Sequence, residues 1–393
     1  MGTTIPLVLN AGRHARYDTP ITVEIGAALN GVAHARLTEV DTGRVIPCQI
    51  DGTKLALILP GIGARTERRL NLELGVEGSR HGGVRLTDGG EGGLSVEIAG
   101  KAFTTYRYLP KGEFPIKARP FFYPLLGPGA VGMTRNYPMR TDVAGEKHDH
   151  PHHRGLWVAF GEVNGTDNWS EEKTHAFQTH QKFSEIVSGP VFGRFVETLH
   201  WESNDRKKVC EEIRTFTTWN LPQDTRVIDI SVTFVASEGE IRFGDTKEGG
   251  LIAIRVPTSM DGERSGTIEN AAGGVGEGET WGRSAQWVDY HGTVEGQHLG
   301  VAIFDHPLNF RHPSPWHVRD YGLFGANPFA HSYYKSSFLK NGAHTVAKGE
   351  TLPFHYRVYL HRGDTRRGDV SGKWSDYAFP PSVKEFKESP EAK

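Results

Sequence analysis

Four histidines fall within ten consecutive residues near the middle of the chain. The segment 148–157 reads HDHPHHRGLW, so it also holds a carboxylate, a guanidinium and an indole. Histidine changes its charge near neutral pH and is the commonest side-chain ligand for metal ions. Pro151 disfavours regular strand pairing, which predicts a loop or a strand edge here. Because polar clusters on loops often carry function, this segment is the first candidate for a site of chemistry.

Two kinds of chemistry fit these residues, and the sequence leaves both open. In the first, His148 and His150 bind a divalent metal ion, and His152, Asp149 or a distant residue completes the set of ligands. In the second, one imidazole is a general acid or base, and Arg154 pairs with an anionic or oxyanionic group. A plain polar loop with its histidines bonded to the backbone is a third interpretation. We favour acid–base chemistry or substrate binding.

The residues that follow are typical of a sugar-binding site. Asn164, Asp167, Asn168 and Trp169 combine amides, a carboxylate and an indole within six positions. An indole ring stacks on the apolar face of a sugar, while polar groups bond its hydroxyls. Core packing is the alternative explanation for any single tryptophan. Further indoles that supply such a platform are Trp157, Trp281, Trp287 and Trp316.

A tight turn at 244–250, GDTKEGG, gathers charged side chains between two expected strands. Glu248, next to a lysine and two glycines, is a candidate carboxylate base, and Asp245 is a candidate substrate ligand. An ordinary hairpin loop is the alternative interpretation of this segment.

A third cluster repeats the His-Pro theme in the segments 305–307, DHP, and 311–317, RHPSPWH. From it we take His306 as a candidate catalytic residue. Trp316 and His317 are candidate substrate-binding residues.

The elements that must position these residues are strands. Apolar and polar residues alternate with a period of two in 228–234 and in 354–361, and helical periodicity is nearly absent. The 48 glycines and 22 prolines suit a fold with many turns. We therefore predict an all-β protein. Five short strand candidates in the first 80 residues are 20–25, 33–40, 45–50, 54–59 and 68–74.

The spacing of strands and polar segments divides the chain into four parts. Residues 1–80 are expected to form a small β-sandwich, and the Gly-rich segment 81–93 a linker. Residues 94–363 are expected to form a large antiparallel β-sandwich with the chemistry, and 364–393 a docked C-terminal arm.

Composition excludes several classes of protein. A net charge of −2 gives no surface for nucleic acid, and no apolar stretch approaches the ~20 residues of a membrane helix. Only Cys48 and Cys210 are present, and no signal peptide is visible, so we expect reduced thiols and a cytoplasmic location. The oligomeric state is left open, and a homo-oligomer is compatible with the sequence.

The segments 149–157 and 164–169 resemble the DUF6807 family, as do 119–125, RPFFYPL, and the DHP at 305–307. Members are often labelled methane oxygenase PmoA, but a particulate methane monooxygenase subunit needs membrane helices, which this sequence lacks. The resemblance implies a bacterial protein of carbohydrate catabolism. It also implies a fold similar to the galactose mutarotase-like supersandwich.

The resulting hypothesis is a carbohydrate-active enzyme that cleaves or rearranges a glycoside, including one already oxidised to a keto-glycoside. His153 or His306 would protonate an oxygen, and Glu248 would act as base. No cofactor is required, and the partner is a small sugar or glycoside. The alternatives are a metal-dependent glycosidase or lyase with a divalent ion at the histidines, and a non-catalytic carbohydrate-binding protein. Expected substrate-binding residues are His152, Arg154, Trp157, Asn168, Trp169, Asp245, Trp316 and His317.

Overall fold

The computed structural model describes residues 3–78, 82–334 and 339–386. The first residue of the expected linker and the end of the expected C-terminal arm lie outside these ranges. The chain is nearly all β, as predicted, and its strands form antiparallel sheets. No helix in the described part has the length and apolar character needed to cross a membrane.

The N-terminal part contains two small sheets that face each other across an apolar core. The first has the order β26-β1-β7-β3-β4 and the second β2-β6-β5. Leu7, Leu37 and Leu57 are among its fully buried side chains. The strands are β1 (Thr4–Asn10), β2 (Thr19–Glu24), β3 (Ala35–Glu39), β4 (Val45–Ile46), β5 (Cys48–Asp51), β6 (Lys54–Leu59), β7 (Glu67–Leu74) and β26 (Ser382–Glu385).

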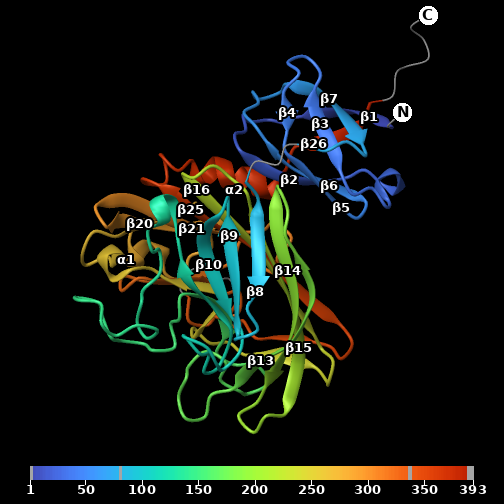
Figure 1. The fold of residues 1–393 in the computed structure, drawn as a ribbon. Coiled ribbons are helices and arrows are strands. Elements are labelled where there is room, and N and C mark those ends of the chain that lie inside the picture. Colours follow the sequence, from blue (N-terminus) through green and yellow to red (C-terminus); the bar gives the residue numbers. More distant parts are fainter. Residues whose placement is uncertain (1–2, 79–81, 335–338, 387–393) are drawn as a thin grey trace, which may run out of the picture.

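The C-terminal segment is part of this N-terminal unit. Strand β26 pairs antiparallel with β1, and Figure 1 shows this red strand among the blue ones. Helix α2 (Val370–Ala378) lies at the junction with the larger part of the chain (Figure 1). There the buried Asp376 carboxylate accepts hydrogen bonds from His14, Arg16 and Thr19. The expected arm is therefore an integral strand and helix that hold the two parts together.

The larger part is built from two eight-stranded sheets. The first has the order β22-β23-β18-β12-β11-β10-β9-β8, and the second β13-β14-β15-β16-β25-β21-β20-β19. Strand β8 lies inside the segment expected to be a linker, because alternating apolar residues let it pair with β9. The first sheet contains β8 (Val84–Asp88), β9 (Gly93–Ile98), β10 (Lys101–Arg107), β11 (Phe121–Leu125), β12 (Leu156–Phe160), β18 (Gly249–Arg255), β22 (Trp316–Arg319) and β23 (Leu323–Ala326).

The second sheet contains β13 (Phe177–Val187), β14 (Phe192–Glu202), β15 (Lys208–Trp219), β16 (Thr225–Val235), β19 (Thr267–Asn270), β20 (Trp287–Val294), β21 (Gln297–Asp305) and β25 (Thr351–Arg362). A separate pair joins β17 (Ile241–Phe243) to β24 (His344–Val346). Helix α1 (Glu277–Thr280) and the 3-10 turns η1 (Ala27–Leu29), η2 (Pro128–Ala130) and η3 (Thr258–Met260) complete the elements.

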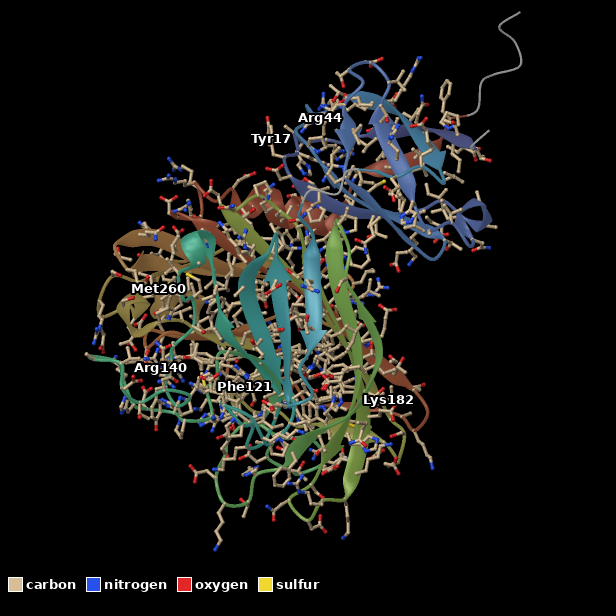
Figure 2. All side chains as sticks on the ribbon, viewed as in Figure 1. Tyr17, Arg44, Phe121, Arg140, Lys182 and Met260 are labelled. Carbon is tan, nitrogen blue, oxygen red and sulfur yellow. The ribbon has the colours of Figure 1, made fainter. Side chains whose placement is uncertain are left out.

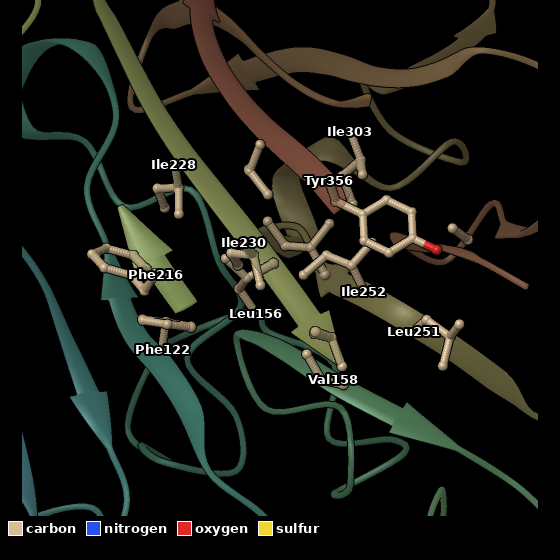
Figure 3. Packing of buried hydrophobic residues seen from close by; sticks show 14 of the residues in the cluster. Phe122, Leu156, Val158, Phe216, Ile228, Ile230, Leu251, Ile252, Ile303 and Tyr356 are labelled. Atoms are coloured by element: carbon tan, nitrogen blue, oxygen red, sulfur yellow. The ribbon is translucent and has the colours of Figure 1, made fainter. Parts of the chain in front are cut away.

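The main core lies between the two large sheets. Leu156 and Val158 of β12 pack with Ile228 and Ile230 of β16, as Figure 3 shows. Each fully buried aliphatic side chain of this kind contributes roughly 1.5–3 kcal/mol to folding. Because side chains on a strand alternate between faces, the residues between these ones point to the opposite, outer face of the sheet.

The outer face of the first sheet is covered by a second apolar layer and by long loops. Phe121, Trp157, Ala159 and Ala253 belong to this layer. The loop between β11 and β12, which carries Arg140, runs along this side of the molecule (Figure 2). The outer face is therefore where the histidine-rich segment lies.

Candidate functional site

A cavity of about 770 Å³ opens on the outer face of the first large sheet. Its walls come from the loop before β12, the loop after β12, the turn before β18, strand β22 and the turn that follows β22. The lining side chains with polar or aromatic groups are His150, His152, His153, Glu162, Thr166, Asp167, Trp169, Ser170, Thr246, Lys247, Glu248, His317, Arg319 and Tyr321.

The histidine loop is held in a tight conformation. His150 has a left-handed backbone with a φ of 42°, and its carbonyl accepts a hydrogen bond from the His153 N–H at 3.0 Å. Gly155 has a φ of 60°, and a Cβ there would lie 2.2 Å from the Phe122 carbonyl oxygen. Only glycine fits such a close approach, so it allows β12 to start directly against β11. The histidines are thereby fixed at the beginning of a strand.

His152 and His153 are uncharged at neutral pH. Burial is the main cause: together with the nearby Arg119 it lowers the pKa of His152 to about 4. His153 is 1 % exposed, and burial together with His152 and Arg255 places its pKa well below the ordinary value. An uncharged imidazole cannot hand an extra proton to a substrate, so the structure disfavours the expected role of His153 as proton donor.

His317 reaches the cavity from strand β22. Its neighbour Trp316 points into the core between the sheets, and alternation turns His317 to the outer face. Burial, helped by Arg319, lowers the pKa of His317 to about 4. Its Nδ1 lies 3.4 Å from the Gly249 carbonyl oxygen. Because a carbonyl only accepts, Nδ1 carries the proton and Nε2 keeps a free lone pair.

Glu248 presents a carboxylate from the turn before β18. Lys247 Nζ lies 2.6 Å from Glu248 Oε1. Burial raises the pKa of Glu248, but the Lys247 hydrogen bond and the nearby His317 outweigh this effect and leave the pKa below its usual value. The turn is fixed by Gly161, whose N–H donates to the Glu248 carbonyl at 2.7 Å. An ionised carboxylate that faces a cavity is a candidate base.

Aromatic rings form the wall next to the histidines. Tyr321 stacks on His150 with ring centroids 4.8 Å apart, and His150 stacks on His153 at 4.9 Å. Trp169 meets His153 edge-on at 5.5 Å and is itself 3 % exposed. Burial raises the pKa of Tyr321, so its hydroxyl stays protonated. Tyr321 is partly exposed and Trp169 is buried, so the Tyr321 ring is the more accessible of the two to a ligand.

Several expected substrate ligands are used inside the protein instead. Arg154 forms a two-pronged ion pair with Glu171 at 2.8 and 2.9 Å and does not line the cavity. Trp157, 1 % exposed, packs behind His153, and Trp316 is fully buried with its Nε1 bonded to the Ala285 carbonyl. Arginine and tryptophan side chains bond or pack against buried residues of the protein as readily as they bind ligands. The sequence alone does not distinguish these two uses.

The remaining expected residues lie beside the cavity or away from it. Asn168 is buried next to Thr166, and Asp245 accepts hydrogen bonds from the Ser332 and Gly342 N–H groups. His306 is not part of the cavity lining: its ring packs at 5.0 Å against Tyr377 of helix α2. The turn after β21 packs against helix α2, where the Trp374 indole donates a hydrogen bond to the Asp305 carbonyl. His306 therefore lies apart from the candidate residues that line the cavity.

The histidines expected as metal ligands lie in different surroundings. His148 stacks on Tyr137 at 4.6 Å, away from the cavity lining, while His150 and His152 face the cavity. Within residues 3–78, 82–334 and 339–386, no three His, Cys, Asp or Glu side chains are grouped so that they could hold a metal ion. The three histidines expected as ligands therefore do not converge.

The structure adds cavity residues that the sequence did not single out. Arg319 and Tyr321 reach the cavity from β22 and from the turn after it, and Lys247 reaches it from the Glu248 turn. Alternation from His317 could have indicated Arg319, two residues on. Tyr321 carries no local signal, because its position depends on how the turn after β22 folds.

Two solved structures are similar to this chain at low sequence identity. One solved structure, a protein in glycosyl hydrolase family 38 from Enterococcus faecalis, is 12 % identical with a TM-score of 0.46; the match covers 98 % of this chain and 48 % of that chain. An α-mannosidase from Enterococcus faecalis V583 is 12 % identical with a TM-score of 0.41, at 98 % and 46 % coverage. This chain thus spans about half the length of these proteins. No curated protein matches it.

The family is decided by the sequence itself. The family model described as "Family of unknown function (DUF6807)" matches residues 93–375, which include every strand of the two large sheets except β8 and every residue of the cavity lining. This is the family that the histidine-rich segment resembles. The chain belongs to the DUF6807 family.

Proposed function

We propose that the protein is a carbohydrate-active enzyme that cleaves or rearranges a small glycoside by acid–base catalysis in this cavity. The main support for the proposal is that two proton-accepting side chains and an aromatic ring line the same cavity. The ionised Glu248 and the free lone pair of His317 face the same space as the ring of Tyr321. Such a combination binds the apolar face of a sugar and removes a proton from it.

The charges of the lining favour an uncharged sugar. Lys247 is held by Glu248 at 2.6 Å, and Arg319 by Glu277 at 2.8 Å. Among the described lining residues, the arginine and the lysine are thus both engaged by carboxylates. A sugar acid would need a cation that is free to pair with it. A neutral glycoside or keto-glycoside meets no such requirement.

The roles in this proposal follow from the protonation states. Glu248 accepts a proton from an attacking water molecule or from a sugar carbon next to a carbonyl group. The departing oxygen receives a proton from the Lys247 ammonium or from the Tyr321 hydroxyl, which both line the cavity. His317 accepts a hydrogen bond from a sugar hydroxyl through Nε2. His306 has no role in this scheme.

A panel of neutral glycosides and their keto derivatives, with products followed by mass spectrometry, tests the proposal. Glu248→Gln should abolish turnover and leave sugar binding by calorimetry nearly unchanged. Glu162→Gln is the matched control, because Glu162 is another carboxylate of the same lining and pairs with the exposed Arg242. Lys247→Met and Tyr321→Phe identify the proton donor.

The alternatives give different results in the same experiment. Sugar binding without turnover on any glycoside would establish a non-catalytic binding protein and refute the enzyme proposal. Turnover that is lost after chelation and restored by a divalent ion would refute the metal-independent mechanism.

A further inference from the structure

Behind the cavity wall, a buried arginine contacts the ring of His153. Arg255 is fully buried at the end of β18, and its Nη1 lies 3.2 Å from His153 Nδ1. The guanidinium is itself fixed, because its Nη2 donates to both Asp149 oxygens, at 2.9 and 3.3 Å. Arg135, also fully buried, donates to the same carboxylate. Arg255 does not line the cavity, so it acts on a ligand through the lining residues that it contacts, which are His153 and the Tyr321 ring, whose centroid lies 4.8 Å from the guanidinium carbon.

We propose that Arg255 is a positioning residue that fixes His153 as a neutral ring with its proton on Nε2, available as a hydrogen-bond donor to the cavity. A guanidinium only donates hydrogen bonds, so the Nδ1 atom that faces Arg255 must accept. A neutral imidazole with an accepting Nδ1 carries its proton on Nε2. No hydrogen bond to Nε2 is present among the described residues, and His153 lines the cavity, so this N–H is left for a ligand.

The surroundings of His153 keep the ring in this state. His150 and His152 come from its own loop, Arg135 and Arg255 lie behind it, and the Tyr321 ring is parallel to it at 6.3 Å. A second proton on His153 would face two buried guanidinium groups and would have to break the contact with Arg255. These groups and burial both lower the pKa of the ring.

This assignment gives the histidine wall a function that complements the bases on the other side. A neutral N–H with positive charge behind it stabilises an oxygen atom that gains negative charge during a reaction. His153 and His317 then have opposite roles, since His153 offers a donor and His317 a lone pair. The catalytic consequence rests on the proposed function, whereas the protonation state of His153 does not.

Nitrogen-15 NMR of histidine-labelled protein tests the protonation state without any substrate. The ¹⁵N shifts of the two ring nitrogens show which one carries the proton, and His153→Gln identifies the signals of this ring. We expect Nε2–H with an unprotonated Nδ1 from pH 8 down to pH 5. In Arg255→Met, the ring should become a mixture of tautomers or gain a second proton within this range. Arg319→Met is the control, because it removes a cation of the lining that has no contact with His153.

Steady-state kinetics, measured with any glycoside that the protein turns over, are the second part of the test. Arg255→Met should lower kcat roughly tenfold or more with little change in KM, since a transition-state donor is misplaced while substrate binding remains. Arg255→Lys, which keeps a donor and a charge, should recover part of the loss. Asp149→Asn, which loosens Arg255 without removing it, is the second variant if Arg255→Met does not fold.

Two results would overturn the inference. One is an Nδ1–H tautomer or a doubly protonated His153 in the unaltered protein at pH 7. The other is an unchanged tautomer in both Arg255→Met and Asp149→Asn. Absence of turnover on every glycoside would contradict the proposed function but leave the NMR result standing.

Discussion

Breaking the ion pair between Arg154 and Glu171 should destabilise the protein far more than it affects a ligand. The side chains are 14 % and 3 % exposed, and two N–H···O bonds of 2.8 and 2.9 Å join them. Removing one partner of such a buried pair leaves the other charge without compensation, which costs roughly 3–5 kcal/mol. Each single change, Arg154→Met or Glu171→Gln, should therefore lower the free energy of unfolding by this amount.

The double variant separates a structural pair from a ligand contact. Because neither charge is left alone in it, the double variant should be less destabilised than the sum of the single variants, with a coupling of about 1–3 kcal/mol. Urea unfolding followed by tryptophan fluorescence, together with thermal melting, measures these differences. Loss of 3–5 kcal/mol should lower Tm by on the order of 10 °C for a domain of this size.

The pH dependence gives an independent check of the same pair. Burial raises the pKa of Glu171, but the Arg154 hydrogen bond and the charges of Arg154 and Arg119 outweigh it, so the folded pKa lies below the unfolded one. The contribution of the pair is then complete above the unfolded pKa and is lost as pH falls through the folded pKa. The stability gap between the unaltered protein and Glu171→Gln should narrow on acidification.

A different outcome would refute the reasoning. If Arg154→Met costs less than 1 kcal/mol and instead raises KM for a glycoside, Arg154 is a substrate ligand, as the sequence suggested, and the ion pair opens on binding.

Three further predictions concern the core, the turn and the histidines. Trp316→Ala should cost roughly 3–5 kcal/mol of stability and leave KM unchanged, because this ring fills the core instead of the cavity; melting and kinetics check it. Gly161→Ala should reduce turnover strongly, since its Cβ would lie 2.2 Å from the Glu248 carbonyl oxygen and displace that turn. The rate should stay level from pH 7 to about 5 and fall near pH 4, where His152 and His317 gain protons; a pH–rate profile measures this.

Matched controls accompany these variants. Gly239→Ala meets no atom within 4 Å, so equal losses in it and in Gly161→Ala would contradict the role of the turn. An acid limb of the pH–rate profile near 6.5, the ordinary value for histidine, would contradict the lowered pKa values. Loss of sugar binding in Trp316→Ala with normal melting would mean that this indole contacts the ligand.

The sequence by itself determined the fold class and much of the candidate site. Period-two alternation and frequent turns predicted an all-β chain, because each strand has to bury one face. The density of histidines marked the segment 148–157, and the charged turn marked Glu248. His150, His152 and His153 of that segment line one cavity together with Glu248. These signals are local, because a cluster of histidines or a charged turn can be recognised from a few consecutive residues.

Tertiary structure decided which side chains are free to meet a ligand. Alternation says that Trp316 and His317 point to opposite faces, but only the pairing of β22 with β23 and the position of the second sheet decide which face is the core. Partners distant in sequence, Glu171 for Arg154 and Arg255 for His153, then determine what each polar residue does. Contacts between distant residues depend on register and sheet packing, which no short sequence pattern encodes.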